Sequence, residues 1–156
     1  MGLPQQQFTN EAASQPEQAK DVSTLPPEAI ALATKLFDFA RQGKTPELQQ
    51  YISAGIPINL TNDKGDTLLM LASYHGHTEA VNMLLQKGAD ANVLNARGQS
   101  PIAGAVFKGH DDVVRALYAK GADIRAGQPN AIDSAEMFEK EDYLRLFDPG
   151  REREAA

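Results

Sequence analysis

The chain has 156 residues, of which 42% are hydrophobic and 23% charged, a composition typical of a single globular domain. It contains no cysteine, which excludes disulfides, thiolate zinc sites and cysteine nucleophiles and fits a reducing compartment. Its 21 acidic and 15 basic residues give a formal net charge of −6, which disfavours nucleic acids and anionic membranes as direct partners.

Residues 1 to 24 are rich in Gln, Glu, Ser, Ala and Pro and carry few large apolar side chains. Such a segment buries too little surface to offset the entropy lost on ordering, so we predict a disordered N-terminal tail. It lacks the basic start and apolar stretch of a secretory signal. No later apolar run reaches the roughly 18 residues that span a bilayer. We therefore expect a cytoplasmic protein, or a nuclear one in a eukaryotic cell, with no membrane partner.

From residue 25 onward the sequence repeats itself at one constant interval, the interval that separates Gly43 from Gly76 and Gly76 from Gly109. A period of this length is typical of solenoid proteins, in which each unit buries its apolar face against its neighbours. The other columns that return at this interval are Gly55, Gly88 and Gly121; Leu36, Leu69 and Ile102; Leu48, Val81 and Val114; Tyr51, Leu84 and Leu117; and Ile52, Leu85 and Tyr118.

One period predicts two helices and a loop. Thr67 opens a short helix that runs to residue 74 or 75, and Gly76 ends it because glycine adopts the left-handed turn at little cost. A second helix is predicted from about residue 77 to 86, with apolar residues on one face, and Gly88 stops it. The stretch "ADANVLNARGQ" then has the Asn, Asp and Gly content of a turn.

Two stretches, "NDKGDTLLMLASYHGHTEAVNMLLQKGADANV" and "NARGQSPIAGAVFKGHDDVVRALYAKGADI", resemble the ankyrin repeat family. They match its Asx-x-x-Gly-x-Thr-Pro-Leu-His opening, Gly-His turn and Leu-Leu-x-x-Gly-Ala-Asp-x-Asn ending. The resemblance implies an all-α ankyrin-repeat solenoid of stacked helix-turn-helix units with protruding β-turn loops. It divides the chain into a tail (1 to 24), a repeat domain (25 to 148) and a frayed end (149 to 156). Within the domain it implies an N-terminal capping repeat (28 to 60), two full repeats (61 to 93 and 94 to 126) and a C-terminal cap (127 to 148) with a shorter loop than the others.

The sequence departs from the family pattern at a few positions. Leu68 and Met70 replace the family's Pro and His in the first full repeat, and Ala103 replaces that His in the second. The hydrogen bonds that this His makes in the family are therefore not expected here. Gly104, inside a predicted helix, costs up to about 1 kcal/mol relative to alanine.

The histidines predict a structural role. His77 and His110 occupy the same slot in successive repeats, directly after the turn glycine, so we expect them to cap or brace that turn. Being one repeat apart, the two form a ladder, and although His75 could add a second imidazole, a zinc site needs three or four ligands that converge on one point. Acidic residues are scattered and phosphate-binding glycine loops are absent. We expect no metal, no cofactor and no enzymatic activity; an enzyme that uses His75 and His77 remains a third alternative.

The resemblance implies that binding occurs on the concave side, built from loop tips and the exposed face of each first helix. Our alignment of the repeats puts Arg41, Tyr74, Phe107 and Met137 in one column there, and an exposed Tyr beside an exposed Phe is a typical interface anchor. The alternatives are that Phe107 merely packs on Tyr74 and that the tip residues are ordinary solvated turns. The predicted partner-binding residues are Arg41, Thr61, Asp63, Lys64, Asp66, Tyr74, His75, Leu94, Arg97, Gln99, Phe107 and Lys108.

The function that the sequence predicts is a monomeric, non-catalytic protein–protein interaction module, an adaptor or stoichiometric regulator, whose partner is another protein. Leu94 and Arg97 at the second tip suit an acidic or mixed partner surface. A dedicated chaperone that binds a basic or unassembled client through the acidic surface is the alternative. Steep loss of binding with salt would indicate the chaperone.

Overall fold

The computed structural model describes residues 20, 21, 23 and 25 to 150, and these form eight helices and two short strands. The elements are β1 (Lys20–Asp21), α2 (Pro27–Gln42), α3 (Thr45–Ser53), β2 (Leu60–Thr61), α4 (Leu68–Tyr74), α5 (Thr78–Gln86), α6 (Pro101–Lys108), α7 (Asp111–Ala119), α8 (Ala131–Met137) and α9 (Glu141–Phe147). The predictions for residues 1 to 19, 22, 24 and 151 to 156 lie outside the described residues.

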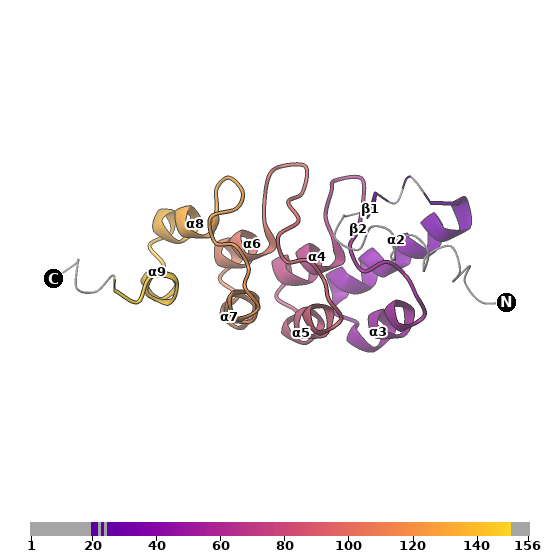
Figure 1. Cartoon of the computed structure of the whole chain (residues 1–156), viewed down its shortest axis with the longest axis horizontal. Helices are drawn as coiled ribbons and strands as arrows, with labels where there is room; N and C mark the ends of the chain where they lie inside the picture. The colour runs from indigo at the N-terminus through magenta and orange to yellow at the C-terminus, as the bar shows by residue number, and fades with distance from the viewer. Residues whose placement is uncertain (1–19, 22, 24, 151–156) are drawn as a thin grey trace.

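The helices stack in two layers (Figure 1). In one layer α4 packs between α2 and α6, and α6 packs against α8; in the other, α5 packs between α3 and α7. The loops that join successive helix pairs project to one side of the stack, at the top of Figure 1. The predicted all-α solenoid is therefore confirmed.

The first helix of each of the last three units begins at a side-chain cap. The Thr67 hydroxyl accepts a hydrogen bond from the Met70 backbone N–H at 3.0 Å, and the Ser100 hydroxyl accepts one from Ala103 at 3.1 Å. Asn130 does the same at the start of α8. Each cap satisfies one of the backbone donors that a helix start leaves without an internal partner. The predicted helix start at Thr67 is confirmed to within one residue.

The turns between paired helices use left-handed backbone. Gly76 and Gly109 have φ angles of +76° and +75°, a region that residues with a Cβ enter at a cost. In the C-terminal unit Glu139 occupies the corresponding place at φ 54°. Glu139 follows Gly109 more closely in the sequence than Gly109 follows Gly76, which fits the expected shortening of the last loop.

The repeated apolar columns form a continuous core. Leu36, Leu69 and Ile102 are all no more than 1% exposed, and so are the members of the column at Leu48 and Val81. Between units, side-chain amides add polar links. Asn59 accepts a hydrogen bond from the backbone of Asp90 at 2.9 Å, and in the equivalent place one repeat later Asn92 accepts one from Asp123 at 2.8 Å. The first two units are thus each fixed to the next by packing and by this repeated hydrogen bond.

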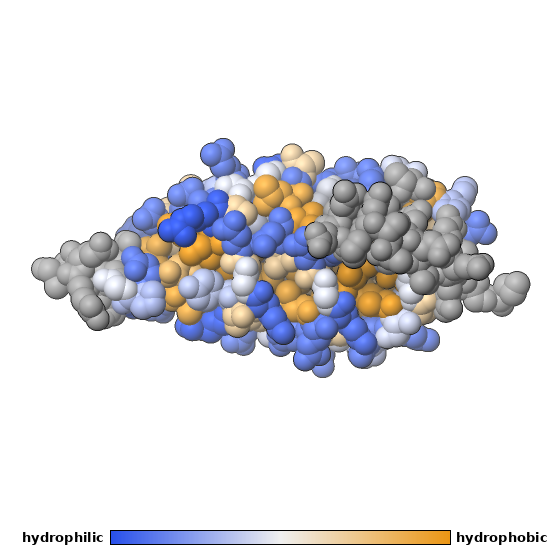
Figure 2. Space-filling view, in the orientation of Figure 1, coloured by the Kyte–Doolittle hydropathy of each residue, from blue (hydrophilic) through white to orange (hydrophobic). Residues whose placement is uncertain are grey.

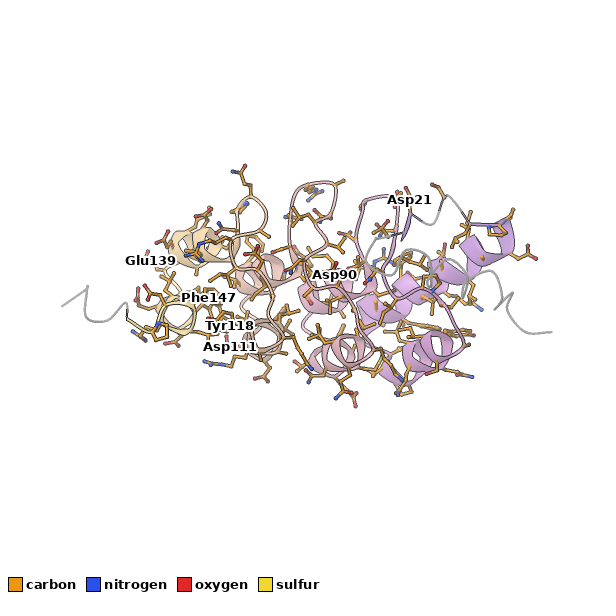
Figure 3. All side chains as sticks on the ribbon, in the orientation of Figure 1. Asp21, Asp90, Asp111, Tyr118, Glu139 and Phe147 are labelled. Atoms are coloured by element: carbon orange, nitrogen blue, oxygen red, sulfur yellow. The ribbon has the colours of Figure 1, made fainter. Side chains whose placement is uncertain are left out.

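The C-terminal cap closes the stack with aromatic side chains. The rings of Tyr118 on α7 and Phe147 on α9, both labelled in Figure 3, lie 5.3 Å apart. The buried Tyr143 hydroxyl donates a hydrogen bond to the Asp111 carboxylate. Burial first, and then this carboxylate, raise the pKa of Tyr143 above its usual range.

The N-terminal boundary differs from the sequence-based expectation. Residues 20 and 21, which we placed in the tail, form β1 and pair in parallel with β2, Lys20 opposite Leu60 and Asp21 opposite Thr61. Leu25 is 6% exposed and belongs to the core. The ordered fold therefore includes a short segment before the first helix.

Candidate binding groove

The loop tips are held by asparagine side chains. The Asn62 amide oxygen accepts hydrogen bonds from the backbone N–H groups of Lys64 at 2.9 Å and Asp66 at 3.0 Å. The same arrangement returns in the next repeat, where Asn95 accepts from Arg97 and Gln99, both at 3.0 Å. These Asx-type bonds fix the backbone of each tip, and so the direction in which Lys64 and Arg97 leave it.

The two tips are also joined to each other. The Ala96 N–H donates to the Lys64 carbonyl at 2.9 Å. The Asn95 side-chain NH2 group donates to Asp66 and to Gln99, each at 2.9 Å. Of the predicted partner-binding residues, Asp66 therefore also holds the two tips together, and Gln99 is bonded within the second tip. Our sequence reasoning did not single out Asn95, although it lies one full repeat after Asn62, which is a usable signal.

Histidine rings link the turn of one unit to the next unit. A nitrogen of His77, Nε2, lies 2.7 Å from the Arg41 carbonyl oxygen, and Nε2 of His110 lies 3.1 Å from that of Tyr74. Each ring rests against the turn glycine of the preceding unit, so that a Cβ on Gly76 would lie 2.7 Å from the His110 ring. The predicted bracing role is confirmed, with the difference that each ring braces the preceding turn and makes no side-chain cap of its own helix.

A hollow of about 490 Å³ lies between the tips and the ends of the first helices. Its walls come from two loops and from α2 and α4, which the stack brings together. The residues that line it are Arg41, Asp63, Lys64, Asp66, Met70, Leu71, Tyr74, His75, Asn95, Ala96, Arg97 and Gln99. We call this hollow, together with the adjoining ends of α6 and α8, the groove.

Comparison with known proteins agrees with this architecture. A profile described as ankyrin repeats, in three copies, matches residues 36–128. The chain belongs to the ankyrin repeat family. A Pseudomonas aeruginosa protein with the provisional name of an ankyrin repeat protein is 60% identical over 47 residues, which are 30% of this chain and 28% of that protein. The match therefore spans less than a third of the relative's length. Ankyrin repeats are generally non-catalytic protein–protein interaction modules.

The ankyrin stack brings eight of the twelve predicted binding residues to the hollow. These are Arg41, Asp63, Lys64, Asp66, Tyr74, His75, Arg97 and Gln99. Phe107 and Lys108 lie at the end of α6, one unit further along the groove. Leu94 is 41% exposed and lies in the second loop. Whether any of these residues contacts a partner stays a prediction.

Among the predicted partner-binding residues, Thr61 was expected to be exposed at a loop tip, and this expectation is wrong. It is 8% exposed, it belongs to β2, and it forms an antiparallel bridge with Thr67 besides its pairing with Asp21. The backbone of this residue is thus part of a small sheet. A buried strand residue of this kind offers little surface to a partner.

Tyr74 is half-buried, although we expected an exposed ring. It lies over Gly104, where an added Cβ would stand 3.4 Å from Tyr74 Cδ1 and 3.3 Å from Met70 Cε. The helical glycine, unfavourable by itself, therefore leaves room for these two side chains of the preceding repeat. The Lys108 ammonium group lies 5.2 Å from the centre of the Tyr74 ring, within cation–π range.

Phe107 is 52% exposed, and its aromatic contact is with Phe138, whose ring centre lies 5.1 Å away at an interplanar angle of 75°. The alternative that Phe107 packs on Tyr74 is therefore replaced by a pair with the next unit. Met137, which follows Phe107 in the aligned column, is 63% exposed. We call Phe107, Met137 and Phe138 the aromatic patch.

Positive charge concentrates around His75. Partial burial of this imidazole lowers its pKa below the usual value. The charges of His77, Arg41, Lys108 and His110 lower it further. The Arg41 guanidinium is bonded to Asp38 at 2.7 Å in an exposed pair. No described carboxylate forms an ion pair with Lys64 or Arg97. The groove of this acidic protein is therefore rich in cations.

The described residues offer no metal site and no membrane span. Among them, no group of three or more His, Asp or Glu side chains is arranged to hold a metal ion. The helices of residues 25 to 150 are also too short or too polar to cross a bilayer. The three histidines instead serve the turns and the groove wall.

Proposed function

We propose that this ankyrin domain is a stoichiometric adaptor or regulator that binds a segment of one partner protein in the groove. The observation that carries the proposal is the hollow of about 490 Å³ between the loop tips and the first helices, with half-buried and exposed polar side chains around Tyr74. A concave site of this size accommodates a few side chains of a partner and orients them with polar groups.

The rigidity of the site favours tight binding. The tips are fixed by Asn62 and Asn95, the turns by His77 and His110, and the tips are bonded to each other through Ala96. A preformed surface loses little conformational entropy on association, so more of the contact energy remains as affinity. This suits a protein that acts by occupying or tethering its partner, as a monomer.

The alternative, a chaperone for a basic client, requires a surface dominated by carboxylates. The hollow is lined by three permanent cations, Arg41, Lys64 and Arg97, and by two carboxylates, Asp63 and Asp66. One of these carboxylates already accepts a hydrogen bond from Asn95. Like-charge repulsion would weaken a basic client at this place, so we favour groove recognition.

Affinity capture from a lysate of native cells, after chemical crosslinking, tests the proposal. The baits are the wild type and the double variant Arg97→Glu, Phe107→Ala, which changes one exposed residue of the hollow and one of the aromatic patch. Exposed substitutions of this kind change stability by less than about 0.5 kcal/mol. We expect one protein to be retained by the wild type and lost by the variant.

The matched control is Lys87→Glu, Gln50→Ala, which makes the same change in charge on exposed positions associated with the second helices. This control should retain the partner as the wild type does. Equal capture by all three baits would place the binding surface outside the groove. Capture of nothing by the wild type would contradict the adaptor function.

A further inference from the structure

The groove has two chemically different halves along the stack. The half at α2 and α4 carries Arg41, Lys64 and Arg97, with His75 between them. The half at the ends of α6 and α8 carries the aromatic patch, whose members are 42% to 63% exposed. Lys108, over the Tyr74 ring, stands between the two halves.

Exposure of the apolar side chains of the aromatic patch to solvent does not stabilise the fold. Among the described residues, the large apolar side chains that are exposed are Leu94, Phe107, Met137 and Phe138, and three of these four form the patch. Clustered exposed apolar groups on a protein surface mark interaction sites. The Phe107–Phe138 pair, edge to face, offers aromatic surface to an apolar side chain.

The cationic half contains cations that have no ion-pair partner among the described residues. Lys64 and Arg97 are exposed on tips whose backbone is fixed, and no described carboxylate pairs with them. Asp63 and Asp66 also line this half, and Asp66 is hydrogen-bonded to Asn95. Arg41 is paired with Asp38 at 2.7 Å, so the cations of this half without an ion pair among the described residues are Lys64 and Arg97. A carboxylate that enters the hollow would gain charge-assisted hydrogen bonds from fixed donors, which are stronger than neutral ones.

We propose that the groove recognises a segment of another protein in which acidic side chains adjoin a large apolar side chain, with the carboxylates at Lys64 and Arg97 and the apolar group on the aromatic patch. This deepens the proposed function and rests on it. A nucleic acid would match only the cationic half, and the net charge of −6 opposes a phosphate backbone. A basic segment would match neither half.

Selection from a phage-displayed library of random dodecapeptides on the full chain tests this inference. We expect the wild type to enrich peptides that contain Asp or Glu beside Phe, Leu, Ile or Met. The variant Lys64→Glu, Arg97→Glu should lose the acidic preference, and Phe107→Ala, Phe138→Ala should lose the apolar one. The control Lys87→Glu, Lys120→Glu, with the same change in charge at the ends of second helices, should select as the wild type does.

The enriched peptide, labelled with fluorescein, then gives dissociation constants by anisotropy. Each groove variant should bind it at least about tenfold more weakly, as expected for loss of an anchor. Enrichment of basic peptides, no enrichment, or equal affinity in the groove variants would overturn the inference. Competition of the peptide by polyuridylate with comparable affinity would also overturn it, in favour of nucleic acid.

These outcomes are separable from failure of the proposed function. The capture experiment reports whether the groove binds any protein, whatever its chemistry. If capture depends on the groove while the selected peptides are basic or absent, the adaptor function stands and the acidic–apolar preference is wrong. If capture is independent of the groove, the function itself fails.

Discussion

His110 and His77 act at the residue scale by linking one repeat to the preceding turn. The His110 Nε2 atom lies 3.1 Å from the Tyr74 carbonyl, which belongs to the preceding repeat. Its removal leaves this carbonyl without that partner, so His110→Ala should lower the free energy of unfolding by about 1 kcal/mol. Urea unfolding followed by circular dichroism measures the change.

The matched control for this prediction is His75→Ala. His75 is exposed, and its ring contacts are with Tyr74 and His77, at centroid distances of 5.5 and 6.4 Å. Its removal should change the free energy of unfolding by less than about 0.5 kcal/mol. Equal losses in the two variants would show that the ring-to-carbonyl contact is not what stabilises the stack.

The pKa of His75 also reports on the charge of the groove. Because partial burial and neighbouring cations lower its folded-state pKa, the unfolded chain binds more protons between that pKa and 6.5. The contribution of His75 to stability is therefore complete above pH 6.5 and is lost as the pH falls through the folded-state pKa. Proton NMR of the imidazole Cε1–H should show His75 titrating below 6.5.

An acidic ligand should move this titration in the opposite direction. A carboxylate in the hollow favours the imidazolium form, so the selected peptide should raise the His75 pKa relative to the free protein. By linkage, the same peptide should bind more tightly as the pH falls through the His75 titration. An unchanged His75 pKa at saturating peptide would contradict binding in this half of the groove.

At the scale of elements, substitution of two turn glycines distinguishes the cost of left-handed backbone from the cost of a steric clash. Gly76→Ala puts a Cβ both in left-handed backbone, at φ +76°, and 2.7 Å from the His110 ring. Gly121→Ala has the same kind of backbone, at φ +85°, with nothing within 4 Å. The left-handed backbone alone costs a residue with a Cβ about 1 to 2 kcal/mol. We expect Gly76→Ala to lose at least about 1 kcal/mol more than Gly121→Ala in urea unfolding, since a rigid ring has to move.

The periodic elements were predictable because each depends on local chemistry that returns in every repeat. Thr67 and Gly76 mark the ends of α4 by capping and by left-handed backbone, and the apolar columns mark the buried face. The β1–β2 pairing was not predictable in this way. Its two strands are very short and far apart in the sequence, and neither has the alternation that identifies a strand. The error at Thr61 follows from this missed pairing.

At the scale of the whole molecule, the sequence predicted which residues lie along the groove and part of its chemistry, but not the contacts between repeats. Column arithmetic placed Arg41, Tyr74 and Phe107 in line, and the loop pattern placed Lys64 and Arg97 at the tips. The aromatic patch, the bond between the two loop tips and the packing over the helical glycine of α6 all join different repeats. Such contacts depend on how the units stack, which a single repeat does not specify.

The surface of the stack differs in polarity from one region to another. Figure 2 shows hydrophilic residues along the edge formed by the second helices and hydrophobic residues between the two layers. Exposed acids such as Asp112, Glu79 and Asp142 lie at the starts of second helices, where they stabilise the helix dipole. The loop side differs in that Arg41, Lys64 and Arg97 line the hollow there together with Asp63 and Asp66.

The most direct test of groove binding is site-specific photocrosslinking in native cells. A benzophenone amino acid replaces Phe107 in the groove or Arg115 on α7, both exposed. We predict one adduct of defined mass from position 107 and none from position 115. An adduct from position 115 with none from position 107 would contradict the account and place the partner on the second helices.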